Sequence, residues 1–284
     1  MLDRGMASPL ISTADLAARL GAPGLRLIDA SWHLDGRDGR PDFDAARLPG
    51  AVFFDLEASS DPDSSLPHML PTPGFFAARM GGLGIAAEAS IVVYDTVGIR
   101  SSARAWWMFR AMGARDVRVL DGGLPKWLAE GRAVESGPAA PPTATTFTPR
   151  SRPELVADLD AVRAALQVGD QVLDARAADR FEGRAAEPRA GLRSGRMPGA
   201  LNLPFPAVLN PDGRMKQGEA LAQAFREAGV DLDRPVVTTC GSGVTAAILS
   251  LGLAVLDRPS RLYDGSWAEW GGRADTEVVS VPPA

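Results

Sequence analysis

Residues 235–250 read Pro-Val-Val-Thr-Thr-Cys-Gly-Ser-Gly-Val-Thr-Ala-Ala-Ile-Leu-Ser. The first five have the β-branched composition of a buried strand, and the apolar run from Ala246 is typical of a helix. Two glycines between them allow a tight turn, and Cys240, the only cysteine of the chain, stands at that turn. The junction indicates an α/β fold with reactive side chains at the carboxyl end of the strand.

The position of Cys240 favours a nucleophilic thiolate. A sulfur at the start of a helix faces unpaired backbone N–H groups and the positive end of the helix dipole, and both stabilise an anion. The alternative is a buried, unreactive cysteine, which is the commoner role of a lone cysteine.

The pattern around this junction occurs twice in the chain. Four pairs of blocks match in the same order: residues 26–30 with 171–175, 47–51 with 196–200, 91–95 with 236–240, and 121–127 with 264–270, separated by 143 to 149 residues. Four matches at nearly constant separation indicate a tandem duplication.

The repeat predicts two domains joined by a linker. Residues 131–153 are rich in proline, alanine, serine and threonine, which favours an extended linker over a packed element. We therefore expect a first domain at 1–135, a linker at 136–154 and a second domain at 155–284. Each is expected to be a mainly parallel sheet flanked by helices. The helices expected in the second domain are 158–166, 219–228 and 246–255.

The two halves differ where the chemistry is expected. At the position of Cys240 the first half has Asp95, and no glycine-rich loop follows it. A carboxylate cannot replace a thiolate nucleophile, so the reactive centre is expected in the second domain alone.

Composition excludes several classes of function. The chain of 284 residues is 45% hydrophobic and 23% charged, and it has no apolar run long enough to span a membrane. A net charge of −5 argues against nucleic acid as a partner. Charged residues interrupt Met1 to Leu20, so we expect no secretory signal. A single cysteine cannot form an internal disulfide, which is consistent with the cytoplasm.

The motifs themselves resemble a known family. Residues 240–246 (Cys-Gly-Ser-Gly-Val-Thr-Ala), the block 264–267 (Asp-Gly-Ser-Trp) and residues 68–71 (His-Met-Leu-Pro) are similar to those of the two-domain sulfurtransferases of the rhodanese superfamily. The resemblance extends from about Leu10 to Trp270. Members that use thiosulfate usually carry basic residues after the cysteine. Gly241 and Ser242 stand there in this chain, so it looks more like the members that use 3-mercaptopyruvate.

The resemblance implies a role for each motif residue. Cys240 would accept the sulfur, and the backbone N–H groups of Gly241, Gly243, Val244 and Thr245 would surround it. Arg180 and Arg189 would hold the carboxylate and carbonyl of 3-mercaptopyruvate, as planar guanidinium groups can. Ser242, His68 and an acidic residue, here Glu57 where some members have Asp, would form a proton relay.

The implied reaction moves sulfur from 3-mercaptopyruvate, through a persulfide on Cys240, to a thiol acceptor such as thioredoxin or to cyanide. No cofactor and no metal are expected. Two alternatives stay open, which are thiosulfate:cyanide sulfur transfer and a persulfide carrier or sensor without turnover. A cysteine-dependent phosphatase is rejected because Ala246 stands where that chemistry needs an arginine.

Weaker interpretations of the site residues also stay open. His68 can be an ordinary loop residue, and Arg180 and Arg189 can form a solvated basic face. Ser242 can serve only as a small residue that permits the turn.

Overall fold

The computed structural model describes residues 8–281, which form two compact units. The first unit comprises the chain up to residue 63, residues 70–152 and residues 210–215. The second comprises residues 64–69, 153–209 and the chain from residue 216. The first seven residues of Met1–Leu20 and the last three of the predicted second domain lie outside the described range.

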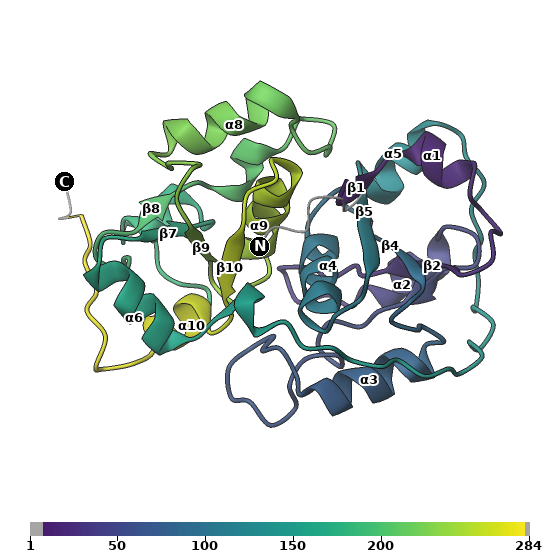
Figure 1. The fold of residues 1–284 in the computed structure, drawn as a ribbon, viewed down its shortest axis with the longest axis horizontal. Helices are drawn as coiled ribbons and strands as arrows, with labels where there is room; N and C mark the ends of the chain where they lie inside the picture. The colour runs from purple at the N-terminus through teal and green to yellow at the C-terminus, as the bar shows by residue number, and fades with distance from the viewer. Residues whose placement is uncertain (1–7, 282–284) are drawn as a thin grey trace. The chain divides into compact units, whose positions relative to one another are not determined.

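The first unit is built on a parallel sheet with the strand order β1-β5-β4-β2-β3 (Figure 1). Its strands are β1 (Leu10–Ile11), β2 (Leu25–Asp29), β3 (Val52–Phe53), β4 (Ser90–Tyr94) and β5 (Asp116–Leu120). Its helices are α1 (Thr13–Ala17), α2 (Arg40–Ala45), α3 (Pro73–Gly82), α4 (Ser101–Ala111) and α5 (Gly123–Ala129).

Helices cover both faces of this first sheet. On one face, Leu16 of α1, Phe43 of α2 and Trp127 of α5 are buried against strand residues. On the other, α4 packs on β4 and β5, and α3 joins it through an edge-to-face contact of Phe76 and Phe109 with ring centroids 5.3 Å apart. A core on both faces explains why the central strand β4 is apolar almost throughout.

The second unit repeats this architecture. Its parallel sheet has the order β6-β10-β9-β7-β8, which is the first order with each strand replaced by its repeat. Its strands are β6 (Val156–Ala157), β7 (Gln171–Asp174), β8 (Leu201–Asn202), β9 (Val236–Thr239) and β10 (Ser260–Tyr263). Its helices are α6 (Leu159–Gln167), α7 (Ala178–Phe181), α8 (Gly218–Glu227), α9 (Ala246–Val255) and α10 (Ser266–Trp270), with 3₁₀ turns η1 (Pro153–Leu155) and η2 (Phe205–Val208).

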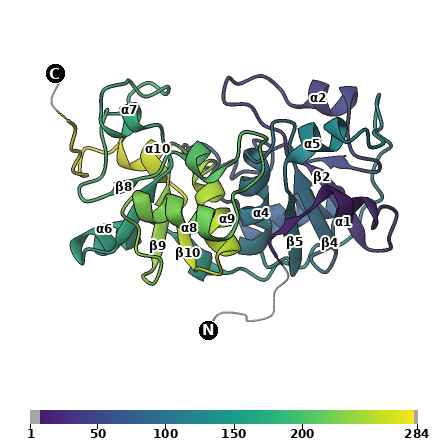
Figure 2. The same cartoon turned by 90° about the horizontal axis from the view of Figure 1, so that it is seen from above.

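The helices of the second unit also divide between two faces (Figures 1 and 2). Val162 of α6 and Trp267 of α10 lie in one buried cluster with β-strand residues. On the other face α8 lies against α9, where a Cβ added at Gly252 would be 3.3 Å from the ring of Phe225. The predicted α/β duplication with parallel sheets is confirmed, and the expected helices lie within one residue of α6, α8 and α9.

The expected linker is extended but packed. Residues 136–152 form no helix or strand, as their composition predicts. Phe147 is nevertheless buried in the first unit, with its ring 5.4 Å from that of Phe76, and Thr145 donates its N–H to the carbonyl of Gly81. An aromatic side chain that enters a core gives this segment a fixed path.

Two short segments belong to the unit opposite to that expected from their place in the chain. Residues 64–69, which include His68, group with the second unit, and residues 210–215 group with the first. In the latter, Met215 donates its N–H to the carboxylate of Asp121 at 2.9 Å. The limits 1–135, 136–154 and 155–284 describe the order of the repeats along the chain and stay a prediction.

Among the described residues, no helix has the length and apolar character that crossing a membrane would require.

Candidate active site

Strand β9 places Cys240 at the carboxyl end of the second sheet. The strand lies between β7 and β10, and all four of its residues are buried. Cys240 follows directly and is 2% exposed. The sulfur therefore lies at the edge where ligands bind in open α/β sheets.

The loop from Gly241 to Thr245 has open backbone donors. Helix α9 begins at Ala246, and Gly243 takes a φ of 78°, a left-handed conformation that favours glycine. Within residues 8–281, the N–H groups of the five loop residues donate to no protein acceptor. Buried N–H groups are normally paired, so this loop is suited to surround an anion.

His68 and Ser242 are brought together within the second unit. The Nδ1 atom of His68 lies 2.9 Å from Oγ of Ser242, and both residues are buried. His68 has a φ of 61°, an uncommon conformation for a residue with a side chain. Such strain occurs mainly where the surroundings fix a side chain for function.

Both predicted arginines lie beside the first residue of the loop. A Cβ added at Gly241 would be 3.2 Å from Nη2 of Arg180 and 3.9 Å from Nη1 of Arg189. The absence of a side chain at Gly241 thus leaves room for two guanidinium groups next to the cysteine.

A buried carboxylate that sequence reasoning missed holds Arg180. The side chain of Glu187 is 1% exposed and accepts hydrogen bonds from Nη2 of Arg180 at 2.5 Å and from Nε at 3.3 Å. One edge of the Arg180 guanidinium is therefore occupied, and Nη1 is left for a ligand. Arg189 has no ion pair or hydrogen bond within the described chain, so its whole guanidinium is available.

The same carboxylate joins Arg180 to a second buried ion pair. Glu187 accepts from Nη1 of Arg176 at 2.7 Å, and Nη2 of Arg176 donates to Asp174 at 2.7 Å. The Arg176 guanidinium also lies 4.1 Å from the ring centroid of Trp267. Burial alone would lower the pKa of Arg176, but the charges of Asp174 and Glu187 outweigh it and raise the pKa. The sequence did contain a signal, because Asp174 and Arg176 stand at the carboxyl end of the strand 171–174. Cys240 follows the neighbouring strand β9 at the same edge of the sheet.

The matching loop of the first unit has its donors already occupied. The carboxylate of Asp95 accepts from the N–H groups of Val97, Arg100 and Ser102 at 2.8 to 3.1 Å. Burial raises the pKa of Asp95 despite these hydrogen bonds. Asp95 therefore acts as a turn and cap residue that fills the space the second unit leaves open.

Glu57, the predicted acid of the relay, belongs to the first unit. Its Oε1 accepts the indole N–H of Trp32 at 2.9 Å. Trp32 fixes the direction of the carboxylate, and the link from Glu57 to His68 stays a prediction.

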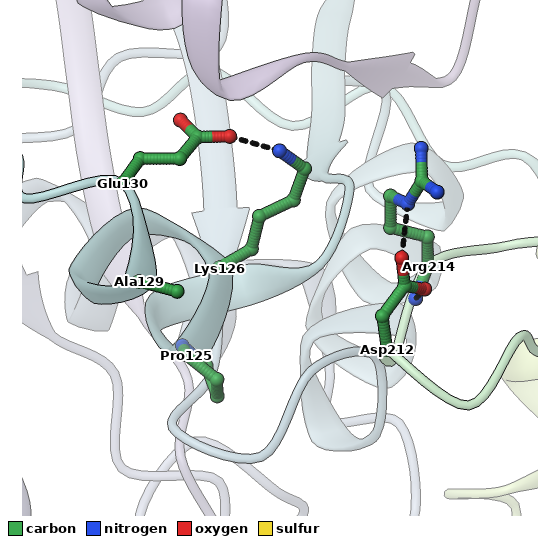
Figure 3. A pocket seen from close by; sticks show the side chains of 6 residues that line it. All are labelled: Pro125, Lys126, Ala129, Glu130, Asp212 and Arg214. Atoms are coloured by element: carbon green, nitrogen blue, oxygen red, sulfur yellow. Dashed lines mark hydrogen bonds and ion pairs between the residues drawn. The ribbon is translucent and has the colours of Figure 1, made fainter.

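A groove of about 520 Å³ lies elsewhere in the first unit, beside α5 (Figure 3). Its charged side chains pair with one another, Lys126 with Glu130, and Arg214 with Asp212 at 2.7 Å. A groove whose charges are already paired offers little to a charged ligand.

Within residues 8–281, no three metal-ligating side chains gather at one point.

Comparisons with known proteins agree with this geometry. The family model described as a rhodanese-like domain matches residues 12–130 and 158–273. The 3-mercaptopyruvate sulfurtransferase of Escherichia coli K12 is 42% identical, over 94% of this chain and 96% of that protein. The thiosulfate/3-mercaptopyruvate sulfurtransferase 1, mitochondrial, of Arabidopsis thaliana is 40% identical, over 96% of this chain and 78% of that protein.

Among solved structures, that of SseA from Escherichia coli, described as a 3-mercaptopyruvate sulfotransferase, is 38% identical with a TM-score of 0.83. It covers 92% of this chain and 99% of that one. The chain therefore belongs to the rhodanese-like family and carries two domains of that fold.

Proposed function

We propose that the chain is a sulfurtransferase that takes sulfur from 3-mercaptopyruvate onto Cys240 and passes it to an acceptor. The observation that carries this proposal is the loop at Gly241, where a lone cysteine, five open N–H groups and two guanidinium groups meet. An anionic sulfur and an α-keto acid need this combination of donors and cations. Membership of the family and the names of the relatives support it.

In the first step the Cys240 thiolate attacks the sulfur of the substrate. The new S–S bond forms as the carbon–sulfur bond breaks, and its electron pair passes to carbon as the enolate of pyruvate. The substrate hydrogen stays on the outer sulfur, and a proton completes pyruvate. In the second step a thiolate or cyanide attacks the outer sulfur and releases the Cys240 thiolate. No oxidant or reductant is consumed.

The two arginines take unequal parts in this proposal. Arg189, with a free guanidinium, binds the substrate carboxylate with two parallel hydrogen bonds. Arg180 gives its Nη1 to the carbonyl oxygen, on which negative charge develops, since Glu187 occupies its other edge. Arginine variants at 180 and 189 test this: both should raise KM, and loss of Arg180 should also lower kcat.

Ser242 and His68 supply the proton that the enolate requires. Their contact of 2.9 Å lies within hydrogen-bond reach. We expect His68→Ala to lower kcat by about 10²-fold, the lower range for general acid–base catalysis. His33→Ala is the matched control, since His33 pairs with Asp42 in the first unit. Unchanged turnover by His68→Ala at saturating substrate would rule out a proton-transfer role for His68.

The acceptor we propose is a thiol, either thioredoxin or a small thiol, with cyanide as an artificial acceptor. We also propose that the reaction takes place in the cytoplasm, where a lone cysteine stays reduced.

Thiosulfate is the second candidate substrate, because the relative from Arabidopsis thaliana is named a thiosulfate/3-mercaptopyruvate sulfurtransferase. Thiosulfate carries two negative charges and would be bound best by additional cations in the loop, but Gly241 and Ser242 add none. Steady-state turnover of both substrates by one preparation separates them. The proposal expects a higher kcat/KM for 3-mercaptopyruvate, and the reverse order would favour thiosulfate. A carrier without turnover would form the persulfide once and release no further pyruvate when thiol is added.

A further inference from the structure

Ser266, at the start of α10, has a backbone conformation that serine rarely adopts. Its φ is 50°, in the left-handed region, and the residue is fully buried. A left-handed conformation at a residue with a side chain costs on the order of 1 kcal/mol or more and persists only where the surroundings impose it. The contacts of Ser266 show what it is held against.

The side chain of Ser266 joins β10 to the cysteine. Its hydroxyl donates to the carbonyl of Tyr263 at 2.8 Å, which turns the oxygen lone pairs toward the N–H of Cys240, 3.4 Å away. The next two residues hold the same segment, because Trp267 donates its N–H to the carbonyl of Cys240 and Ala268 donates to that of Gly241, both at 2.9 Å.

These bonds decide which way the loop donors point. In a trans peptide the C=O and the following N–H point in opposite directions within one plane. The carbonyl of Cys240 is fixed toward α10, so the N–H of Gly241 points away from α10. The carbonyl of Gly241 fixes the N–H of Ser242 in the same manner. Two of the five open donors therefore owe their direction to the start of α10.

The first unit provides an internal comparison. The block 121–125 matches 264–268, and Gly123, with a φ of 57°, stands at the position of Ser266. Leu124 donates to the carbonyl of Asp95 at 3.0 Å, as Trp267 does to that of Cys240. Gly123 has no hydroxyl, and Pro125 has no N–H to match that of Ala268. Only the copy with the nucleophile has all three tethers.

We propose that Ser266 is a positioning residue for Cys240, and that the strained serine is present because its hydroxyl fixes the cysteine backbone. The inference rests on the proposed function, in which the loop N–H groups stabilise the thiolate and its persulfide. Ser266 itself does not touch the substrate. A glycine would adopt the same φ without strain, as Gly123 does, so the backbone turn alone does not require serine.

Two substitutions separate the hydroxyl from the strain. Ser266→Gly removes the hydroxyl and relieves the backbone, whereas Ser266→Ala removes the hydroxyl and keeps the strain. We expect both to slow sulfur transfer by about tenfold, less than the 10²–10³ lost with a direct donor. kcat should fall more than KM rises, and the thermal midpoint should be higher for Ser266→Gly than for Ser266→Ala.

The rate of alkylation of Cys240 by iodoacetamide at neutral pH is the second readout, since it does not depend on the substrate. It should fall by about the same factor in both variants if the donors stabilise the thiolate. Ser250→Ala is the control, because it removes another buried hydroxyl of the second unit, one that bonds to Thr238 at 2.8 Å. This variant should keep both rates.

The proposal is overturned if Ser266→Gly keeps the wild-type rates of alkylation and pyruvate release. It is also overturned if the rates of the two variants only follow their thermal midpoints. If the wild-type protein releases no pyruvate from 3-mercaptopyruvate, the proposed function fails. The alkylation rates still decide the role of Ser266.

Discussion

Glu187 determines how Arg180 can act at the site. A buried carboxylate shared by two arginines keeps both guanidinium planes fixed, and Asp174 completes a cluster with equal numbers of positive and negative charges. Arg189 adds a positive charge that the cluster does not balance. A substrate carboxylate would supply the missing negative charge, so the unequal pairing of the two arginines favours an anionic ligand.

We predict that Glu187→Gln raises KM for 3-mercaptopyruvate by about tenfold, equivalent to about 1.4 kcal/mol of binding free energy. Glutamine keeps the size of the side chain but loses the charge that fixes Arg180. Steady-state kinetics with the variant test this. Glu219→Gln is the control, because Glu219 pairs with Arg226 at the exposed surface of α8. Equal KM values for all three proteins would show that Arg180 needs no such support.

The two copies of the strand–loop–helix element differ in what occupies the loop. In the first copy, the Asp95 carboxylate accepts hydrogen bonds from N–H groups of the loop. In the second copy, the N–H groups of residues 241–245 have no protein acceptor within residues 8–281. The backbone at Gly241 has no left-handed φ, so glycine is needed there for space and not for conformation. Any side chain at that position would compete with the guanidinium groups.

Gly241→Ala should therefore raise KM while the protein stays folded. The added methyl group would be 3.2 Å from Nη2 of Arg180, which is closer than ordinary contact, so the arginine must move. We expect a change of about tenfold, and substrate titrations measure it. Gly82→Ala in α3 is the control, because a Cβ there meets nothing within 4 Å and should leave KM unchanged. An unaltered KM in Gly241→Ala would place the substrate away from the arginines.

The elements of the second sheet were largely predictable from sequence, and the charge network was not. Apolar runs bounded by turns gave α6, α8 and α9 to within one residue. The ion pairs of Glu187 join residues 7 and 11 positions apart in an irregular segment, where no periodicity indicates which side chains meet. The positive φ of Ser266 was equally hard to predict, because serine rarely adopts a left-handed conformation and nothing in the sequence marks this one.

At the scale of the molecule, the first unit has a buried acidic pair near the end of its sheet. Burial, together with the negative charge of Asp95, raises the pKa of Asp29 from 3.8 to about 6. In the unfolded chain Asp29 releases its proton near the lower value. The contribution to stability is therefore full at pH below 3.8 and is lost as the pH rises toward 6. The loss amounts to about 3 kcal/mol.

Asp29→Asn imitates the protonated carboxyl and should remove this pH dependence. We expect the variant to exceed the wild-type free energy of unfolding by about 3 kcal/mol at pH 8, with the difference closing toward pH 4. Urea unfolding of both proteins across this range measures it. Asp63→Asn, at an exposed carboxylate, should show no such trend. A difference that stays constant with pH would mean that folding does not raise the pKa of Asp29.

The division into compact units was only partly readable from the sequence. The repeat and the proline-rich segment predict two α/β units and where the chain passes between them. They do not predict that residues 64–69 and 210–215 each join the other unit, because those contacts involve short loops without periodic apolar residues. The linker prediction likewise overlooked Phe147, a single aromatic residue in a polar stretch.

The central claim is that Cys240 takes sulfur from 3-mercaptopyruvate. Mass spectrometry of the protein after incubation with this substrate, without an acceptor, tests it most directly when pyruvate is measured in parallel. We predict that the peptide containing Cys240 gains the mass of one sulfur atom, that pyruvate forms in an equal amount, and that Cys240→Ser shows neither. Pyruvate release by Cys240→Ser, or release by the wild type with an unmodified Cys240, would contradict the account.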